Sequence, residues 1–563
     1  MAESTNLRTG GQVLIDQLKI HGVDTAFCVP GESYLAALDA LHDARDQIKL
    51  VVCRQEGGAA YMAEAYGKLT GRPGICFVTR GPGATNASVG VHTAFQDSSP
   101  MILFIGQVAR DQVEREAFQE IDFRRMYGPM AKWVAEIDDA ARIPEYVSQA
   151  FHRAVNGRPG PVVLALPEDM LTDRVGIADA GHYKPARPAP SAAQMQDLRE
   201  RLAKSKRPLM ILGGGGWSSE AVADIRAFAE AMNLPTGCSF RCQDLLDNLH
   251  ANYAGDVGIG INPKLAARVK NADLLLVVGA RLGEMTTSGY TLLDIPVPQQ
   301  TLIHVHASAE ELGRVYQAAL PINAGMAEFA AMAKALAPIA SRAWDAETMA
   351  AHAEYLEWST PPQVEGPVQM GGIMAWLESR LPEDAIMTNG AGNYATWLHR
   401  FHRYRRFRTQ LAPTNGSMGY GVPSAIAAKS VAPGRMVVSF NGDGCYMMNG
   451  QELATAVQYA LPVIFVIVNN STYGTIRMHQ ERTYPGRVSG TDLVNPDFVA
   501  LARAYGAHGE LVEQTADFAP AFERCAKAGK PAVIEIRLSA EVLTPRQTLS
   551  QIRAAALAAQ AKS

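Results

Sequence analysis

Two apolar runs in the last third of the chain each end in a short polar motif, and this pattern constrains the fold strongly. The first run ends at Asn441 to Cys445 (Asn-Gly-Asp-Gly-Cys), and the second, Leu461 to Val468, ends at Asn469-Asn470. The interval between Asp443 and Asn470 has room for one helix, which we expect to begin near Asn449. The two strands of such a unit are parallel, so both side chains should meet at the carboxyl edge of one sheet.

Asp443 and Asn470 offer a carboxylate and an amide oxygen, and Mg²⁺ prefers oxygen ligands of this kind together with phosphate groups. The start of the following helix would add amide donors for phosphate. Taken alone, Gly-Asp-Gly is more often a surface turn and Asn-Asn a loop. Because each motif follows a strand-like run, we expect a site for a magnesium-bound diphosphate.

The 563 residues exceed what a single core can hold and predict about three or four domains. A net charge of −4 offers no basic surface for nucleic acid or membrane. No apolar run reaches the ~18 residues of a membrane span, and Met1 to Gly10 lacks the apolar segment of a secretory signal. We therefore expect a cytoplasmic protein without a nucleic-acid or membrane partner.

Alternating helical and strand-like stretches divide the chain into three α/β units, at about residues 1–180, 191–340 and 361–550. This alternation is typical of parallel sheets. A linker rich in Pro and Ala, Lys184 to Pro190, should be extended and exposed, and a polar helical linker, Ala340 to Gly366, follows the second unit. We predict an α/β protein of three consecutive, doubly wound, parallel-sheet domains.

The seven cysteines lie mostly in apolar contexts, which favours reduced thiols in a cytoplasm. Cys238 and Cys242 lack a second ligand pair, and we interpret them as structural residues rather than zinc ligands. The alanine-rich tail from Gln551 to Ser563 predicts a helix.

Several motifs together resemble those of thiamine diphosphate enzymes, in particular the group of acetolactate synthase, pyruvate oxidase and oxalyl-CoA decarboxylase. Besides the Asp443 and Asn470 motifs, they are Arg54 to Tyr66, Val78 to Asn86, Ala117 to Glu120, Gly390 to Tyr394 and Gly416 to Gly421. The resemblance covers about residues 10 to 545. It implies a pyrimidine-binding, a central Rossmann-like and a diphosphate-binding domain, and it is more specific for the cofactor than for the substrate.

In the first domain, the resemblance implies that Glu56 is the carboxylic acid that contacts the aminopyrimidine ring of the cofactor. A solvated glutamate at a helix start is the alternative, which we rank second because Glu56 follows the apolar strand Lys49 to Cys53. Gln119 would be a polar group on the substrate side. Glu32 follows Val29-Pro30-Gly31 and is either a catalytic acid or an ordinary helix-start residue.

In the third domain, the resemblance implies the cofactor and metal ligands. Met418 would separate the two cofactor rings, although methionine is more often a core filler. The metal ligands would be Asp443, Asn470 and the backbone carbonyl of Thr472. The remaining cofactor-binding residues would be Gly392, Asn393, Tyr394, Gly416, Gly442, Gly444, Cys445 and, again, Thr472.

The sequence also departs from acetolactate synthases. Met285 replaces an arginine and Glu168 a lysine of that group, and His479 replaces a tryptophan. Because a thioether cannot make the bidentate bonds of arginine to a carboxylate, we expect a neutral aldehyde, or a bulkier apolar partner, to be a better acceptor than a second 2-oxo acid. The arginines that could supply the missing charge are Arg281, Arg477 and Arg546.

The central domain carries the weakest signal. Gly213 to Gly216 does not complete a G-x-G-x-x-G motif because Ser218 takes the last position. Ala254 to Gly260 matches the flavin-binding stretch of the family only loosely. FAD or ADP in this domain is an alternative that we rank below a domain without nucleotide.

The resemblance implies an enzyme that uses thiamine diphosphate and Mg²⁺ to decarboxylate a 2-oxo acid and to ligate the product to a second carbonyl compound. It also implies a homodimer or homotetramer whose site closes between domains of two subunits. Two alternatives remain open: a simple decarboxylase or 2-hydroxyacyl-CoA lyase, and a non-catalytic regulatory paralogue. Glu56, Asp443 and Asn470 argue against the paralogue.

Overall fold

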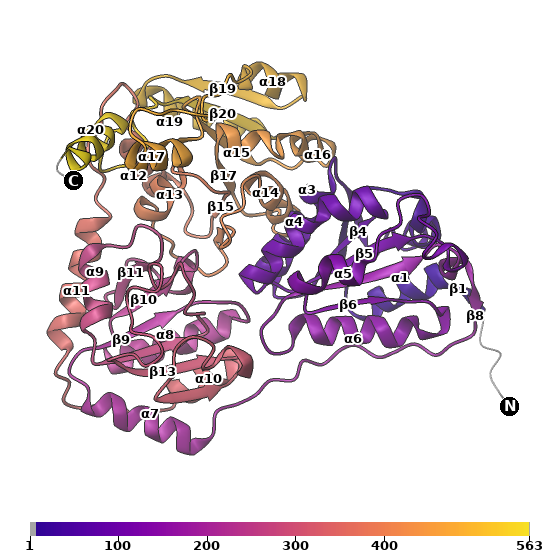
Figure 1. Cartoon of the computed structure of the whole chain (residues 1–563), viewed down its shortest axis with the longest axis horizontal. Helices are drawn as coiled ribbons and strands as arrows, with labels where there is room; N and C mark the ends of the chain where they lie inside the picture. Colours follow the sequence, from indigo (N-terminus) through magenta and orange to yellow (C-terminus); the bar gives the residue numbers. More distant parts are fainter. Residues whose placement is uncertain (1–6, 562–563) are drawn as a thin grey trace. The chain divides into compact units, whose positions relative to one another are not determined.

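The computed structural model describes residues 7–561. Residues 1–6, most of the polar N-terminal stretch, and 562–563, the end of the predicted C-terminal helix, lie outside the described residues. The chain forms two compact units, Met1–Arg187 and Pro188–Ser563, and the second contains two sheets. Within residues 7–561, three six-stranded parallel sheets with flanking helices confirm the predicted three-domain α/β fold (Figure 1).

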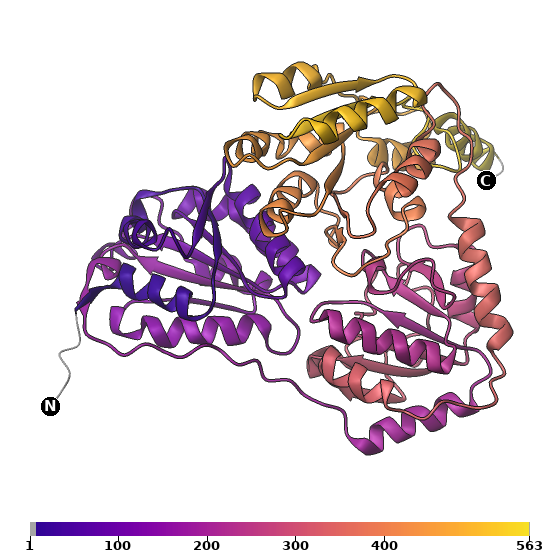
Figure 2. The ribbon, with the colours of Figure 1, turned by 180° about the vertical axis from the view of Figure 1, so that it is seen from behind.

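The first sheet has the order β3-β2-β4-β5-β7-β6. Its strands are β2 (Thr25–Cys28), β3 (Lys49–Val52), β4 (Gly74–Val78), β5 (Met101–Gln107), β6 (Trp133–Glu136) and β7 (Pro161–Pro167). β4, β5 and β7 are buried along their whole length, as expected for strands covered on both faces. Helices α1 (Gly10–Ile20), α2 (Leu35–Asp43) and α6 (Ile143–Val155) cover one face, while α3 (Glu56–Thr70) and α4 (Gly81–Asp97) pack together on the other (Figures 1 and 2).

The second sheet has the order β11-β10-β9-β12-β13-β14, which is the order of dinucleotide-binding sheets. Its strands are β9 (Pro208–Leu212), β10 (Thr236–Ser239), β11 (Tyr253–Val257), β12 (Leu274–Val278), β13 (Thr301–His306) and β14 (Leu320–Asn323). Helices α7 (Ala192–Lys204), α8 (Ser219–Met232) and α10 (Met326–Lys334) pack on one face, and α9 (Pro263–Asn271) packs on the other. Part of the predicted helical linker forms α11 (Asp345–Trp358), which packs against β11.

The third sheet has the order β16-β15-β17-β18-β20-β19. Its strands are β15 (Ile386–Asn389), β16 (Gln410–Leu411), β17 (Val437–Gly442), β18 (Ile464–Asn469), β19 (His508–Val512) and β20 (Ala532–Arg537). Counted within each domain, this strand order is the same as that of the first sheet. The two outer domains therefore share one topology, a relationship that no sequence repeat indicated.

The helices of the third domain position the loops of its carboxyl edge. They include α12 (Met370–Arg380), α13 (Ala395–Phe401), α14 (Gly421–Val431), α15 (Asp443–Met447), α16 (Leu453–Gln458), α17 (Gly474–Thr483), α18 (Phe498–Ala504), α19 (Thr515–Lys527) and α20 (Leu549–Gln560). The helix expected near Asn449 is confirmed, because a 3-10 turn at Gly450–Glu452 leads into α16. The sequence did not predict α15, which begins earlier, at Asp443, directly after the extended Gly442. Asp443 thus occupies a first helical turn, where the helix dipole favours a negative charge.

Reciprocal hydrogen bonds join the central and third domains of the second unit. The Asn248 N–H donates to the Tyr404 carbonyl (2.9 Å), and the Tyr404 N–H donates to Asn248 Oδ1 (2.9 Å). The Gln243 N–H donates to Gln410 Oε1 (2.8 Å). The central domain thus fixes the loop that leads into β16.

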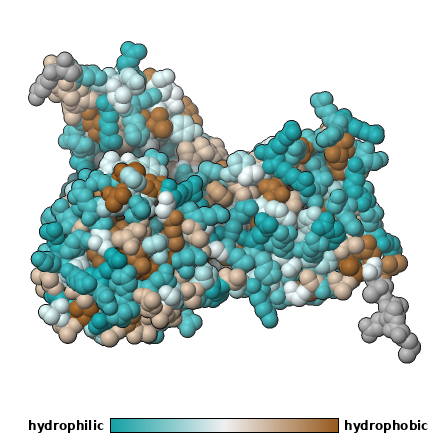
Figure 3. All heavy atoms as spheres, turned by 60° about the horizontal axis from the view of Figure 1, so that its bottom comes forward, coloured by the Kyte–Doolittle hydropathy of each residue, from teal (hydrophilic) through white to brown (hydrophobic). Residues whose placement is uncertain are grey.

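The segment from Lys184 to Pro190 has no regular secondary structure and is mostly exposed, as predicted. On the face seen in Figure 3, hydrophilic side chains predominate and hydrophobic ones form small, scattered groups. Between residues 7 and 561, no helix combines the length and the apolar character needed to cross a bilayer.

Candidate functional site

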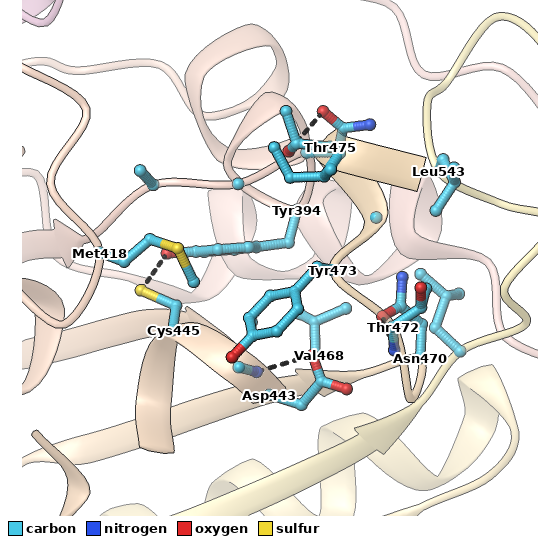
Figure 4. A pocket seen from close by; sticks show the side chains of 18 of the residues that line it. Tyr394, Met418, Asp443, Cys445, Val468, Asn470, Thr472, Tyr473, Thr475 and Leu543 are labelled. Atoms are coloured by element: carbon cyan, nitrogen blue, oxygen red, sulfur yellow. Dashed lines mark hydrogen bonds between the residues drawn. The ribbon is translucent and has the colours of Figure 1, made fainter. Parts of the chain in front are cut away.

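A cavity of about 230 Å³ lies in the third domain at the carboxyl ends of β15, β17 and β18 (Figure 4). β16 lies beside β15 on the side away from β17, so the strand order reverses at β15 and β17. Ligands of α/β proteins bind in the crevice at such a reversal.

Every residue that the sequence predicted as a cofactor or metal ligand lines this cavity. They are Gly392, Asn393, Tyr394, Gly416, Met418, Gly442, Asp443, Gly444, Cys445, Asn470 and Thr472. The structure therefore brings together four loops that are separated in sequence.

Asp443 is a buried carboxylate without a cationic partner. Its side chain is only 3% exposed, and within residues 7–561 no lysine or arginine forms an ion pair with it. Burial raises the pKa of Asp443, whereas hydrogen bonds from the Gly444 N–H (2.9 Å) and Asn495 Nδ2 (2.8 Å) lower it. Because a buried carboxylate is costly without a partner, a divalent cation fits this position.

Asn470 and Thr472 lie in a turn that a second segment holds in place. Ser471 has a left-handed φ of 54°, and Thr472 forms an isolated bridge with Asp492. The Thr472 carbonyl accepts from the Gly474 N–H (2.8 Å) and keeps a second lone pair for a metal. With the amide oxygen of Asn470, it completes an oxygen ligand set suited to Mg²⁺.

Asn495 is a site residue that sequence reasoning missed. Its Nδ2 donates both to Asp443 Oδ2 (2.8 Å) and to Asn469 Oδ1 (2.9 Å). Asn469 in turn donates to Glu535 Oε1 (2.8 Å), so one chain of hydrogen bonds orients the Asp443 carboxylate. Asn495 lies in a loop with no motif or fixed spacing that could have indicated it.

Tyr394 and Cys445 join two loops of the cavity. The Tyr394 hydroxyl donates to Cys445 Sγ (3.3 Å) and accepts from the Gly390 N–H (3.1 Å), and the Gly419 N–H also donates to Cys445 Sγ (3.2 Å). A side chain at Gly390 would collide with this sulfur. Met418 is half-buried and lines the cavity (Figure 4), where it could contact a bound cofactor.

Helix α17 contributes a further wall of the cavity. Thr475 Oγ1 donates to Asn393 Oδ1 (3.0 Å), which ties the first turn of α17 to the Gly392 loop. Ala391 and Val468 also line the cavity and belong to stretches that the sequence singled out. The lining residues that carried no sequence signal are Trp397, Tyr473, Gly474, Thr475, Ile476, Leu538, Val542 and Leu543. Three of these, Leu538, Val542 and Leu543, follow β20, so the C-terminal segment also encloses the cavity.

In the first unit, the predicted acids follow the carboxyl ends of β2 and β3. Glu56 is half-buried at the first position of α3, and its Oε2 accepts from Asn86 Nδ2 (2.9 Å). Glu32 is mostly exposed and pairs with Arg80 (3.1 Å). The same buried guanidinium pairs with Glu168 (2.9 Å), one of the departures from acetolactate synthases.

Gln119 lies in the loop after β5 with a left-handed φ of 66°, and its backbone packs on Gly81 at the start of α4. Glu32 follows β2 and Gln119 follows β5. Since these strands are parallel, both residues lie at the carboxyl edge of the first sheet. Phe118, beside Gln119, is exposed and lies over the Arg80 guanidinium at 5.9 Å.

In the central domain, the glycine-rich loop Gly213 to Gly216 allows close backbone packing. A side chain at Gly214 would collide with the Gly279 carbonyl, because the loops after β9 and β12 touch through their backbones.

Met285 is half-buried in the loop after β12, and His479 is exposed on α17. Cys238 is a buried free thiol within β10.

Three family models match the chain. They are described as thiamine pyrophosphate enzyme, N-terminal TPP binding domain (residues 8–126), central domain (195–333) and C-terminal TPP binding domain (390–536). Thiamine pyrophosphate is another name for thiamine diphosphate.

Curated relatives match over most of their length. The acetolactate synthase large subunit of Parasynechococcus marenigrum is 33% identical over 89% of this chain and 83% of its own. The acetolactate synthase large subunit of Corynebacterium glutamicum is 30% identical over 94% of this chain and 86% of its own length. The acetolactate synthase isozyme 2 large subunit of Escherichia coli is 28% identical over 94% of this chain and 95% of its own length. The chain therefore belongs to the thiamine pyrophosphate enzyme family and is an acetolactate synthase-like, thiamine pyrophosphate-dependent enzyme.

Proposed function

We propose that this enzyme binds thiamine diphosphate with Mg²⁺, decarboxylates a 2-oxo acid and transfers the remaining acyl unit to a second carbonyl compound. The observation that carries the proposal is the buried, cation-free carboxylate of Asp443 in a cavity lined by all the predicted ligands. The names of the relatives, acetolactate synthases, support ligation as the outcome.

When bound, the cofactor supplies the nucleophilic carbon and the electron sink that decarboxylation requires. Asp443, Asn470 and the Thr472 carbonyl would hold the metal, and the loop from Gly392 to Tyr394 would hold the diphosphate. The first residues of α15 line the same cavity, and their N–H groups would add donors for phosphate. Met418 would fix the bend of the cofactor.

Glu56 would hold a proton for the aminopyrimidine ring. Because Asn86 already donates to Oε2, the free Oε1 is the oxygen that would carry this proton. Asn86 thus orients the carboxyl group, and Gln119 would contact the substrate. Glu32 is paired with Arg80, which favours a positioning role over proton transfer for this acid.

The charge balance around Arg80 supports a neutral acceptor. Glu32 and Glu168 both pair with this guanidinium, so its positive charge is compensated within the first unit. Met285 adds no charge. A second anionic 2-oxo acid would therefore find fewer cations than the acetolactate synthase pattern provides, and an aldehyde would be the preferred acceptor.

The test is a screen of 2-oxo acids for CO₂ release with and without acetaldehyde or benzaldehyde. We expect CO₂ release with formation of a mixed ligation product. Accumulation of free aldehyde would instead indicate the simple decarboxylase, and cofactor binding without turnover would indicate the paralogue. Efficient acetolactate formation from pyruvate alone, against competing aldehydes, would contradict the proposed acceptor.

Within residues 7–561, no disulfide bond joins any of the seven cysteines. The central domain has a dinucleotide-type strand order, but its glycine-rich loop is filled by backbone packing against Gly279. We therefore keep FAD or ADP as the less favoured alternative for this domain.

A further inference from the structure

Two arginines of the third domain share one tryptophan ring. The guanidinium carbon of Arg400 lies 3.6 Å from the centre of the Trp358 ring, and that of Arg546 lies 4.0 Å from it. Trp358 is the last residue of α11, and Arg400 lies on α13. Within residues 7–561, neither arginine has a carboxylate in ion-pair range, and the Arg546 guanidinium donates no hydrogen bond.

The two positive charges are uncompensated. Burial lowers the pKa of Arg400 to about 10, and the neighbouring charge of Arg546 contributes to this shift. Burial also lowers the pKa of Arg546. The indole face attracts both cations, but an anion would offset their mutual repulsion more effectively through charge-assisted hydrogen bonds.

Arg546 differs in this respect from the other two arginines that the sequence suggested as replacement cations. Arg281 lies 3.4 Å from Glu311, and Arg477 pairs with both Glu481 and Asp492 at 3.2 Å. Of the three, only Arg546 keeps its charge available.

Both arginines follow residues that line the cofactor cavity. Leu543 lines it, and Arg546 comes three residues later, a distance that spans at most about 11 Å of extended chain. Trp397 lines it too, and Arg400 is its neighbour three positions on along α13. Each arginine is therefore separated by only two residues from one that lines the cavity.

We propose that Arg400 and Arg546, supported by Trp358, bind the carboxylate of an anionic 2-oxo acid at the edge of the cofactor cavity. A planar guanidinium matches a planar carboxylate through two parallel hydrogen bonds. The proposal rests on the proposed function for the identity of the substrate, whereas anion binding at this pair can be measured without turnover.

Binding is measured by titrating full-length Asp443→Ala protein, which should not turn over, with pyruvate, using calorimetry and tryptophan fluorescence. Arg546→Gln should weaken pyruvate binding at least about tenfold, because it removes a charge-assisted hydrogen bond to the carboxylate. Arg546→Lys should retain part of the affinity. The matched control is Arg125→Gln, an exposed arginine of the first unit, which should bind like the parent protein.

In otherwise wild-type protein loaded with thiamine diphosphate and Mg²⁺, Arg546→Gln should raise KM for pyruvate about tenfold and change kcat less than about twofold. Unchanged pyruvate affinity in both Arg546→Gln and Arg400→Gln would overturn the site. Tighter binding of inorganic phosphate than of pyruvate would overturn its assignment to a carboxylate. If no 2-oxo acid is turned over but the arginine variants still lose pyruvate binding, the proposed function fails and the anion site stands.

Discussion

Asp443 is the residue on which metal binding depends in the proposed site. Asp443→Ala removes a buried carboxylate that has no cation in the described chain, so the apoprotein should fold at least as well as the wild type. A ligand present at 100 times its Kd stabilises a protein by about 2.7 kcal/mol. This stabilisation by thiamine diphosphate and Mg²⁺ should disappear in the variant, as measured by thermal unfolding.

Cofactor retention after desalting provides a second measurement for Asp443→Ala. Asp197→Ala, which removes a partly exposed carboxylate on α7, is the control and should retain the cofactor. A variant Asp443→Ala that keeps the Mg²⁺-dependent stabilisation would show that the metal lies elsewhere.

Glu56 can be tested separately from cofactor binding. Glu56→Gln keeps the shape of the side chain and the acceptor for Asn86, but it cannot hold the proton on Oε1. Cofactor affinity should persist, while exchange of the C2 proton of the thiazolium ring, followed by NMR, should slow by about 10²–10⁴. Glu145→Gln, on the exposed face of α6, should exchange normally. An unchanged rate in Glu56→Gln would remove Glu56 from this role.

At the scale of elements, helix α20 is held on α17 by a buried ion pair. Glu481 is nearly inaccessible, and Arg553 contacts both of its oxygens (2.6 and 2.8 Å). This arginine, more than any other group, lowers the pKa of Glu481 to about 2. Because α17 lines the cavity, the attachment of α20 should matter for cofactor binding as well as for stability.

Arg553→Gln should loosen α20. Breaking a buried pair costs roughly 3–5 kcal/mol, but Arg553 is about one-third exposed and Arg477 still contacts Glu481, so we expect a loss of about 1–2 kcal/mol. Limited proteolysis should then cut within the C-terminal helix, and cofactor affinity should fall. Arg142→Gln, which breaks an exposed pair, should leave the cleavage pattern unchanged. Equal protease resistance of both variants would contradict the ion pair's role.

The segment leading into the linker packs on a buried histidine. His21 Nδ1 accepts from the Tyr183 N–H (3.2 Å), its ring lies 4.5 Å from that of Phe151, and its Nε2 has no partner. Burial lowers the pKa of His21 to about 4, and the nearby His182 and His152 contribute. The neutral ring is therefore the form that supports the segment.

The sign of the pH dependence follows from this shift. Below about pH 6.5 the unfolded chain protonates His21 while the folded chain does not, so stability is complete above pH 6.5 and falls toward pH 4. The loss should reach about 3 kcal/mol at most. Denaturant unfolding at pH 7 and pH 5 should show a smaller difference for His21→Asn than for wild type, and an unaltered one for the exposed control His42→Asn. The same difference in unfolding free energy between pH 7 and pH 5 for His21→Asn and wild type would refute the assignment of this pH dependence to His21.

At the scale of the whole molecule, the features that could be predicted from the sequence are those that depend on a local pattern of residues, such as buried strands and the motifs that follow them. Buried parallel strands such as β12 are continuous apolar runs, and the spacing of Asp443 and Asn470 placed both residues on one cavity. Contacts between distant loops have no periodic signal. Asn495 lies 52 residues from Asp443, and Glu168 lies 88 residues from Arg80, so neither pairing was predictable from one sequence.

Oligomeric assembly is the last prediction and tests the molecule as a whole. The family resemblance implies that Glu56 of one subunit serves the cofactor held by Asp443 of another. Sedimentation should therefore give at least twice the 60.6 kDa chain mass, through an interface typically above ~2,000 Å².

Subunit complementation tests the shared site directly. Glu56→Gln and Asp443→Ala proteins should each be nearly inactive alone. After co-refolding in equal amounts, half of the random dimers are mixed and each carries one intact site, so about one quarter of wild-type activity should return. Glu56→Gln mixed with the double variant Glu56→Gln/Asp443→Ala is the matched control, because no pairing of these chains restores a complete site. Activity that stays at the control level despite mixed dimers would place both residues in one subunit's site, and an active monomer would contradict the assembly itself.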